Sequence, residues 1–281
     1  MTKTWFITGS SRGLGHAIAT RALQAGDQVV ATARHTDALK DLVAQYGDQL
    51  FPLALDVTDA DAVAKTVKTA TDHFGNIDVL VNNAGFANMA ALEDVPLDDF
   101  KRQMDTDFYG TLYTIKAILP SMRKRQNGHI INISSIGGRA GSAGLAAYQS
   151  AKFAVNGLTE VVAQEVAPFN VKVTTVEPGG MRTDWGGKSM EADVDSVYQD
   201  TVGAMISMVH DGWDDPESDN RYVSEPAKVA DAIYTLSNMT EAPVHLLIGK
   251  DAEQGAEMHE KMLHDSDAKF KELTESTGND Q

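Results

Sequence analysis

Short apolar runs along this chain alternate with longer segments in which apolar positions recur every three or four residues. Alternation of strand-like and helix-like segments is typical of βαβ units. The runs that we interpret as strands are residues 4–8, 28–33, 50–55, 79–82, 129–134, 172–176 and 245–248. The helical patterns between them include residues 14–25, 60–73, 98–123 and 148–166.

Several of these strands are apolar at successive positions rather than at every second one, as in residues 29–31 and 130–133. Strands of this kind are buried on both faces, as in a parallel sheet. Right-handed crossovers then give a doubly wound α/β (Rossmann) fold. We expect a parallel sheet of about seven strands with helices on both faces. No domain boundary or repeat is visible, so residues 1–281 are predicted to form a single domain.

The composition narrows the classes of function. Forty acidic residues against 24 basic ones give a formal charge of −16, which disfavours nucleic acid and anionic membranes as partners. The absence of Cys excludes disulfides, zinc–thiolate sites and thiol nucleophiles. Neither a run of about 18 apolar residues nor a secretory leader is visible, so we expect a cytoplasmic protein without a membrane span.

The first predicted strand leads into the sequence TGSSRGLG, and a helical pattern follows it. Gly9, Gly13 and Gly15 permit a sharp turn and let backbone N–H groups approach a pyrophosphate at the helix N-terminus. Three glycines after a strand describe a purely structural turn equally well. Their place between the first strand and the first helix favours a dinucleotide site.

Two arginines favour NADP(H) over NAD(H). The second strand ends at Arg34, where enzymes that use NAD usually carry an acid for the ribose 2′-hydroxyl. Arg12 lies inside the glycine loop. Guanidinium groups bind phosphate with a planar fork of donors, which suits a 2′-phosphate. The alternative is two solvated surface arginines.

Tyr148 and Lys152 are four residues apart, so both side chains leave one face of a predicted helix. A nearby ammonium favours the phenolate and lowers the pKa of the phenol from about 10 toward the working pH of an acid/base. Ser135 ends a strand at the edge where open α/β sheets bind ligands, with Ser134 as the alternative serine. Without Ser135 and the glycine loop, Tyr148 and Lys152 would be interpreted as packing on the surface of a helix.

In this order and spacing, the motifs resemble those of the short-chain dehydrogenase/reductase family from about Thr4 to Thr183, with weaker agreement through Ile248. The resemblance implies hydride transfer between NADP(H) and a ketone, aldehyde or secondary alcohol. It makes Tyr148 the acid/base, Ser135 the group that orients the substrate oxygen, and Lys152 a ligand of the nicotinamide ribose.

The same resemblance assigns further segments to the cofactor: residues 55–57 beside the adenine, residues 82–85 on the nicotinamide side, and the Pro-Gly motif at 178–179. The residues expected at the cofactor are Gly9, Ser11, Arg12, Gly13, Leu14, Gly15, Arg34, Asp56, Val57, Asn83, Ala84, Gly85, Tyr148, Lys152, Pro178, Gly179, Met181 and Thr183.

Asp107 stands where the family usually has an asparagine that holds a water in a proton relay to the lysine. We count Asp107 among the catalytic residues. Its charge favours Lys152 as ammonium and weakens the effect of that ammonium on Tyr148. Activity is expected to survive with an altered pH profile.

Within the single domain we distinguish three parts. Residues 1–183 are expected to form the cofactor and catalytic core, 184–225 a substrate-capping region, and 250–281 a helical extension. The region 135–185 is similar to hydroxysteroid and retinol dehydrogenases and to bacterial reductases, so we expect a hydrophobic substrate. The apolar residues of this part are either a pocket wall or core: Met181, Trp185, Met190 and Met205.

No metal site is expected. His259 and Glu260 are followed by His264, one residue too far for the zinc motif H-E-x-x-H. Residues 211–221 are acidic but lack the spacing of a calcium loop, and they are interpreted as a solvated loop.

Two other functions stay open: a non-catalytic NADP(H)-binding regulator, for which Asp107 is the support, and an epimerase or dehydratase of the same family. Family members pair through the long helices around 98–123 and 148–166, so a homodimer or homotetramer is expected. Alternatively, the extension beyond Ile248 blocks the tetramer contact.

Overall fold

The computed structural model describes residues 2–183, 194–207, 209 and 223–278. A seven-stranded sheet in the order β3-β2-β1-β4-β5-β6-β7 lies at its centre, and every neighbouring pair of strands is parallel. The doubly wound parallel fold expected from the sequence is confirmed. The strands are β1 (Thr4–Ile7), β2 (Gln28–Ala33), β3 (Leu50–Ala54), β4 (Val79–Asn82), β5 (Gly128–Ile133), β6 (Val171–Pro178) and β7 (His245–Ile248).

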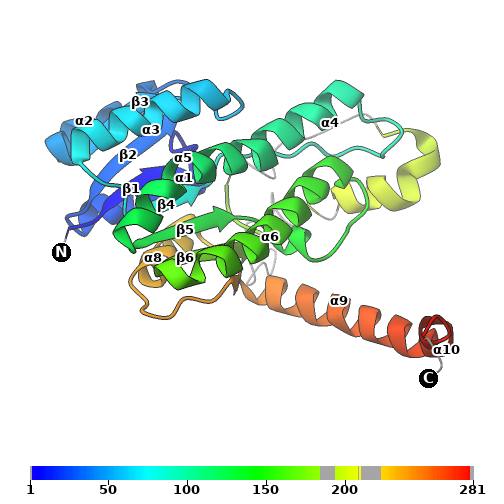
Figure 1. Cartoon of the computed structure of the whole chain (residues 1–281). Coiled ribbons are helices and arrows are strands. Elements are labelled where there is room, and N and C mark those ends of the chain that lie inside the picture. The colour runs from blue at the N-terminus through cyan, green and yellow to red at the C-terminus, as the bar shows by residue number, and fades with distance from the viewer. Residues whose placement is uncertain (1, 184–193, 208, 210–222, 279–281) are drawn as a thin grey trace.

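Helices cover both faces of this sheet (Figure 1). They are α1 (Gly13–Gln24), α2 (Lys40–Tyr46), α3 (Ala60–Phe74), α4 (Leu97–Met104), α5 (Gly110–Arg125), α6 (Ala146–Val166), α8 (Pro226–Ser237), α9 (Lys250–Lys269) and α10 (Lys271–Glu275). Within the described ranges, none of the helices combines the length and apolar character that crossing a membrane requires.

Alternate residues of one strand enter two separate cores. Trp5 and Ile7 of β1 pack with α1, α2 and α8, whereas Phe6 packs with α3, α5 and α6 on the other face. Because successive side chains of a strand point to opposite faces, a strand covered on both sides must be apolar throughout. The continuous apolar runs of the sequence have this cause.

The helix predicted over residues 98–123 is interrupted. Between α4 and α5 lies a π-helical segment, η3 (Asp105–Tyr109), and the chain stays helical through it. A π-helical turn holds one more residue per hydrogen bond than an α-helix, and such turns are frequent at functional sites. Asp107 lies in this turn and is buried.

A chain of buried hydrogen bonds ties two helices to the middle of the sheet. Thr114 of α5 donates to Asn82 Oδ1 (2.5 Å), Asn82 Nδ2 donates to Asn132 Oδ1 (2.8 Å), and Asn132 Nδ2 donates to Thr159 Oγ1 of α6 (2.8 Å). Each buried amide group is paired in this way, which removes the penalty of an unsatisfied polar atom. The chain fixes α5 and α6 relative to β4 and β5.

The helical extension at the C-terminal end consists of α9 and α10. The helix α9 begins next to the end of β7 and runs outward from the sheet, with α10 at its far end (Figure 1). Only its first turns contribute buried residues, Ala252 and Ala256.

Replacing Asn132 with Ala is expected to lower the free energy of unfolding by about 2–3 kcal/mol, because Asn82 and Thr159 lose their buried partner. Urea denaturation followed by circular dichroism measures this change. The exposed residue Asn127 serves as control, and Asn127→Ala is expected to change the free energy by less than about 0.5 kcal/mol. Equal effects of the two substitutions would contradict the role of the network.

Candidate active site

The glycine loop lies between β1 and α1. Gly9 and Gly13 have positive φ angles of 68° and 57°, which side chains other than glycine rarely adopt. A Cβ at Gly9 would lie 2.8 Å from the Cα of Ala84, and a Cβ at Gly15 would collide with the carbonyl oxygen of Gly9. The loop is therefore packed so closely that its glycines are required, and α1 begins at Gly13 with its free N–H groups toward the loop.

The loop is held by the segment that follows β4. Thr8 Oγ1 accepts hydrogen bonds from the backbone N–H groups of Asn83 and Ala84, both at 3.0 Å. Asn83 Nδ2 donates to the carbonyl oxygens of Thr8 (3.0 Å) and Gly9 (3.1 Å). Sequence reasoning did not single out Thr8, although its place just before Gly9 was a usable signal.

A cavity of about 740 Å³ opens at the carboxyl ends of the strands. Every residue expected at the cofactor lines it except Gly15, which packs behind the loop. Leu55, from the segment expected beside the adenine, also lines it. Other residues of the wall were not predicted: Ala33, Thr58, Phe86, Ala87, Asn88, Arg102, Thr106 and Ile133. The volume is within the range of small-molecule and cofactor sites.

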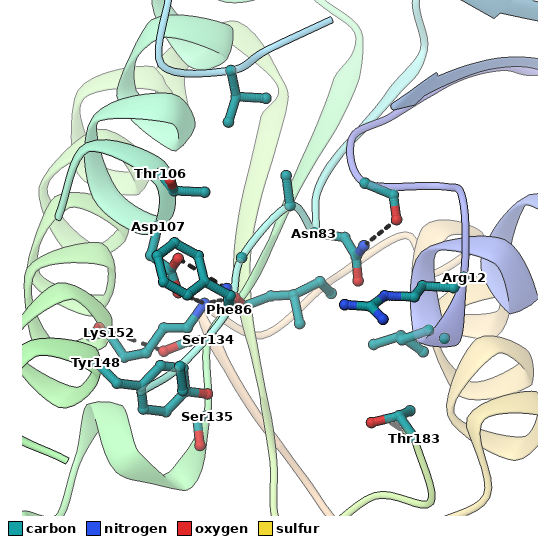
Figure 2. A pocket seen from close by; sticks show the side chains of 18 of the residues that line it. Arg12, Asn83, Phe86, Thr106, Asp107, Ser134, Ser135, Tyr148, Lys152 and Thr183 are labelled. Carbon is teal, nitrogen blue, oxygen red and sulfur yellow. Dashed lines mark hydrogen bonds and ion pairs between the residues drawn. The ribbon is translucent and has the colours of Figure 1, made fainter. Parts of the chain in front are cut away.

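The residues present fit a dinucleotide phosphate. Arg12 lies on the side of the glycine loop, while Tyr148 and Lys152 lie on the opposite side of the same cavity (Figure 2). Arg34, directly after β2, also lines this cavity. The glycine cradle and the N-terminus of α1 provide the close backbone approach and the positive dipole end that a pyrophosphate needs.

Tyr148, Lys152 and Ser135 meet at one end of the cavity (Figure 2). Lys152 Nζ lies 5.5 Å from the centre of the Tyr148 ring and donates to the carbonyl oxygen of Ile133 at 3.0 Å. Ser135 Oγ accepts from the N–H of Gly137 at 3.0 Å and hydrogen-bonds with the phenol of Tyr148. Ser135 and the pair Tyr148–Lys152, which were predicted from two separate motifs, therefore lie together.

The neighbouring serine has a different environment. The hydroxyl of Ser134 is buried and donates to the main-chain carbonyl oxygen of Lys152 at 3.4 Å. Its hydrogen bond connects β5 to α6, whereas Ser135 faces Tyr148. This difference supports Ser135 as the serine that meets the substrate.

The pKa of Tyr148 differs in direction from the sequence-based expectation. Burial raises the pKa of the Tyr148 phenol above its usual value, and the charge of Asp107 adds to this increase. The attraction of Lys152 and the hydrogen bond with Ser135 oppose it without outweighing it. The expectation that Lys152 lowers this pKa overall is wrong for the structure described, because burial is not visible in a four-residue spacing.

Asp107 forms a buried ion pair with Lys152, with Oδ2 3.3 Å from Nζ. Its other oxygen accepts from the N–H of Phe86 at 3.2 Å. Burial raises the pKa of Asp107, although Lys152 opposes this. Burial also acts to lower the pKa of Lys152, but the negative charge of Asp107, with a smaller contribution from Tyr148 in its ionised form, outweighs it and raises that pKa. Lys152 is thus held as ammonium, and Asp107 balances part of its charge.

Gln103 is a further buried residue beside this pair that the sequence did not reveal. Its side-chain amide donates to the carbonyl oxygen of Phe86, the residue whose N–H group bonds Asp107. The position of Gln103, one helical turn before Asp107, was the available signal.

The capping region is described in part. Met205, Ile206 and Val209 pack against a buried cluster of Ala87, Met89, Leu145 and Tyr148. Met181 lines the cavity. Trp185, Met190 and the loop 211–221 lie outside the described residues. Across the described parts of the chain, no group of three or more His, Asp or Glu side chains is placed to hold a metal ion.

Comparison with known proteins agrees with this architecture. A family model described as short chain dehydrogenase matches residues 3–193. The oxidoreductase BOA17 of Botryotinia fuckeliana is 49% identical over 276 residues, with 98% of each chain covered. The chain belongs to the short-chain dehydrogenase/reductase family of oxidoreductases.

Solved structures extend the comparison. A short-chain dehydrogenase from Streptomyces avermitilis superposes with a TM-score of 0.90 at 36% identity, covering 99% of this chain and all of the other. An alcohol dehydrogenase from the archaeon Thermococcus sibiricus, complexed with 5-hydroxy-NADP, gives a TM-score of 0.72 at 25% identity. The alignment covers 89% of this chain and 97% of that one.

Replacing Asp107 with Asn is expected to shift the pH profile of alcohol oxidation toward lower pH. In the alcohol oxidation expected from the sequence, Tyr148 would act as the phenolate, and Asp107 raises the pKa of that phenol while it balances the charge of Lys152. Removing that carboxylate leaves the ammonium free to favour the phenolate, so its pKa falls. Initial rates recorded across the pH range test this. A profile identical to wild type, or one displaced toward higher pH, would refute the assignment.

Proposed function

We propose that this chain is an NADP(H)-dependent oxidoreductase that transfers hydride between nicotinamide and a ketone, aldehyde or secondary alcohol. The observation that carries the proposal is the single cavity that joins the glycine loop to Tyr148, Ser135 and Lys152. A phosphate-binding loop and an acid/base in one cavity allow a bound dinucleotide to present its reactive ring beside a proton donor.

Bound NADPH supplies the hydride for reduction. The protein contributes orientation and a proton. Ser135 hydrogen-bonds the substrate oxygen and holds the carbonyl beside Tyr148. Tyr148 donates its phenolic proton as charge develops on that oxygen, and Lys152 stabilises the phenolate that remains. Because burial raises the pKa of Tyr148, the phenol carries its proton at neutral pH, which suits reduction.

The preference for NADP(H) over NAD(H) rests on charge. Arg12 and Arg34 line the cavity. The second strand ends at Ala33 and is followed by Arg34, with no acid to hold a free 2′-hydroxyl. The NADP-type ligand of the Thermococcus sibiricus relative agrees with this preference.

The substrate class follows from the side chains around Tyr148. The cluster of Ala87, Met89, Leu145, Met205 and Ile206 is apolar. Ala87 and Tyr148 of this cluster line the cavity, and Met181 is a further apolar residue of its wall. An apolar wall gains free energy by burying hydrocarbon, at roughly 25 cal/mol per Å². A hydrophobic carbonyl compound or alcohol is therefore the proposed substrate.

The alternatives predict different behaviour. A non-catalytic regulator would bind NADP(H) without turnover, and Asp107 is the feature that favours it. The contact between Ser135 and Tyr148 supports catalysis instead. An epimerase or dehydratase would release a product without net oxidation of NADPH, so product analysis separates it from a reductase.

A homodimer or homotetramer remains part of the proposal. Tyr109 of η3, Phe153 and Val161 of α6 are large apolar side chains, exposed by 41%, 43% and 53% respectively. Exposed apolar groups on adjacent helices are typical of an interface. Sedimentation velocity measures the assembly and whether it stops at two chains.

Replacing Tyr148 with Phe is expected to reduce carbonyl-dependent NADPH oxidation by about a hundredfold or more, because the general acid is lost. NADPH affinity is expected to change little, since the ring remains. A panel of hydrophobic ketones and aldehydes, followed by NADPH absorbance, provides the measurement. Comparable turnover in Tyr148→Phe would overturn the mechanism, and the Ser134→Ala variant is a control outside the reacting trio.

Replacing Arg34 with Ala is expected to weaken the binding of NADPH roughly tenfold, while the affinity for NADH stays within about twofold of the wild-type value. The reason is the loss of a guanidinium donor to the 2′-phosphate, which NADH lacks. Fluorescence titration with both cofactors gives the ratio. The exposed residue Arg123 provides a control of equal charge, and an unchanged NADPH-to-NADH ratio in Arg34→Ala would exclude the role.

A further inference from the structure

The loop that follows β6, residues 179–183, is anchored by the C-terminal part of the chain. The N–H of Gly179 donates to the carbonyl oxygen of Ile248 at the end of β7 (3.0 Å). The N–H of Ser224 donates to the carbonyl oxygen of Gly180 (2.9 Å), and the carbonyl oxygen of Ser224 accepts from the N–H of Arg182 (3.0 Å). Part of the cavity wall therefore depends on residues far along the sequence.

Asp251, the second residue of α9, provides the remaining anchor. Its Oδ2 accepts a hydrogen bond from the N–H of Gly180 at 2.6 Å. A Cβ at Gly179 would collide with this carboxyl group, and a Cβ at Gly249 would lie 2.6 Å from its Oδ1. Gly249 has a φ of 104°, which lets the chain turn from β7 into α9. Two glycines therefore make room for one carboxylate against the loop.

The environment of this carboxylate differs from that of a solvated helix-terminal acid. Asp251 Oδ1 is a buried atom without a hydrogen-bond partner among the described residues. A buried oxygen left unpaired costs free energy, so the position of Asp251 is not optimised for stability alone. Interaction with the dipole of α9 would favour an acid in the first turn, but exposed Glu253 in that turn supplies the same effect.

The helix α9 also reaches the second loop of the site. A Cβ at Gly255 would lie 3.3 Å from Cγ1 of Ile136, the residue after Ser135. Nine residues beyond Asp251, Glu260 forms an ion pair with Arg139 at 3.4 Å. The first turns of α9 thus contact both loops that border Tyr148.

We propose that Asp251 is a positioning residue for the nicotinamide side of the cofactor site. Its carboxylate fixes the backbone of residues 179–183, so that Pro178, Gly179 and Thr183 form a preorganised wall of the cavity. Asp251 acts through Gly180 rather than by touching the cofactor. This inference rests on the proposed binding of NADP(H).

The test compares Asp251→Ala with Glu253→Ala, which removes the same charge from the same helical turn. Calorimetric titration uses NADPH and adenosine 2′,5′-bisphosphate, the half of the cofactor without nicotinamide. Asp251→Ala is expected to weaken the binding of NADPH about tenfold, because one charge-assisted hydrogen bond is lost. The affinity for the bisphosphate is expected to stay within about twofold of the wild-type value. Glu253→Ala is expected to leave both affinities within about twofold, and Asp251→Asn, which keeps an acceptor oxygen, to give an intermediate NADPH affinity.

Hydrogen exchange of the protein without added ligand provides a second readout. Amides of residues 179–183 are expected to exchange faster in Asp251→Ala and at the wild-type rate in Glu253→Ala. Unchanged NADPH affinity, equal weakening of both ligands, or an equal effect of Glu253→Ala would overturn the inference. If Asp251→Ala fails to fold, Asp251→Asn and Asp251→Ser decide by the same criteria. Wild-type protein that binds neither ligand would instead overturn the proposed function.

Discussion

A phenol, an ammonium and a carboxylate share one buried space at the end of the sheet, and the charge of each depends on the other two. Burial disfavours every charged form, so Asp107 and Lys152 stabilise one another at 3.3 Å while Tyr148 retains its proton. The π-helical turn brings Asp107 into this space from one side, and α6 brings Tyr148 and Lys152 from the other. The chemistry of the site thus depends on how two helices are held against the same strands.

That arrangement follows from the parallel sheet. The carboxyl ends of all seven strands lie on the same side of the sheet, so loops from distant parts of the sequence meet there. The buried hydrogen bonds from Thr114 to Thr159 then fix the two helices relative to the strands between them. A rigid interior supports side chains whose function requires positions accurate to fractions of an ångström.

The strands and most residues of the cavity were predictable from the sequence. The pattern of apolar positions indicates strands, and the glycine and Pro-Gly motifs indicate the turns that follow them. All seven strands were predicted, and the residues expected at the cofactor line one cavity except Gly15. The π-helical turn was not predicted, since an α-helix and a π-turn share the same pattern and the contacts of Asp107 with Phe86 and Lys152 are tertiary. The direction of the Tyr148 pKa shift was missed for the same reason, because it depends on burial. Asp251 carries no local signal, since its partner Gly180 is distant in sequence.

The dependence of residues 179–183 on β7 and α9 has a consequence for how the protein matures during synthesis. The glycine loop and its support at Asn83 leave the ribosome well before Ile248 and Asp251, which lie much further along the chain. The two halves of the cavity are therefore completed at different times. A nascent chain acquires its glycine loop early, but the wall at residues 179–183 lacks its anchors until β7 and the start of α9 have also been made.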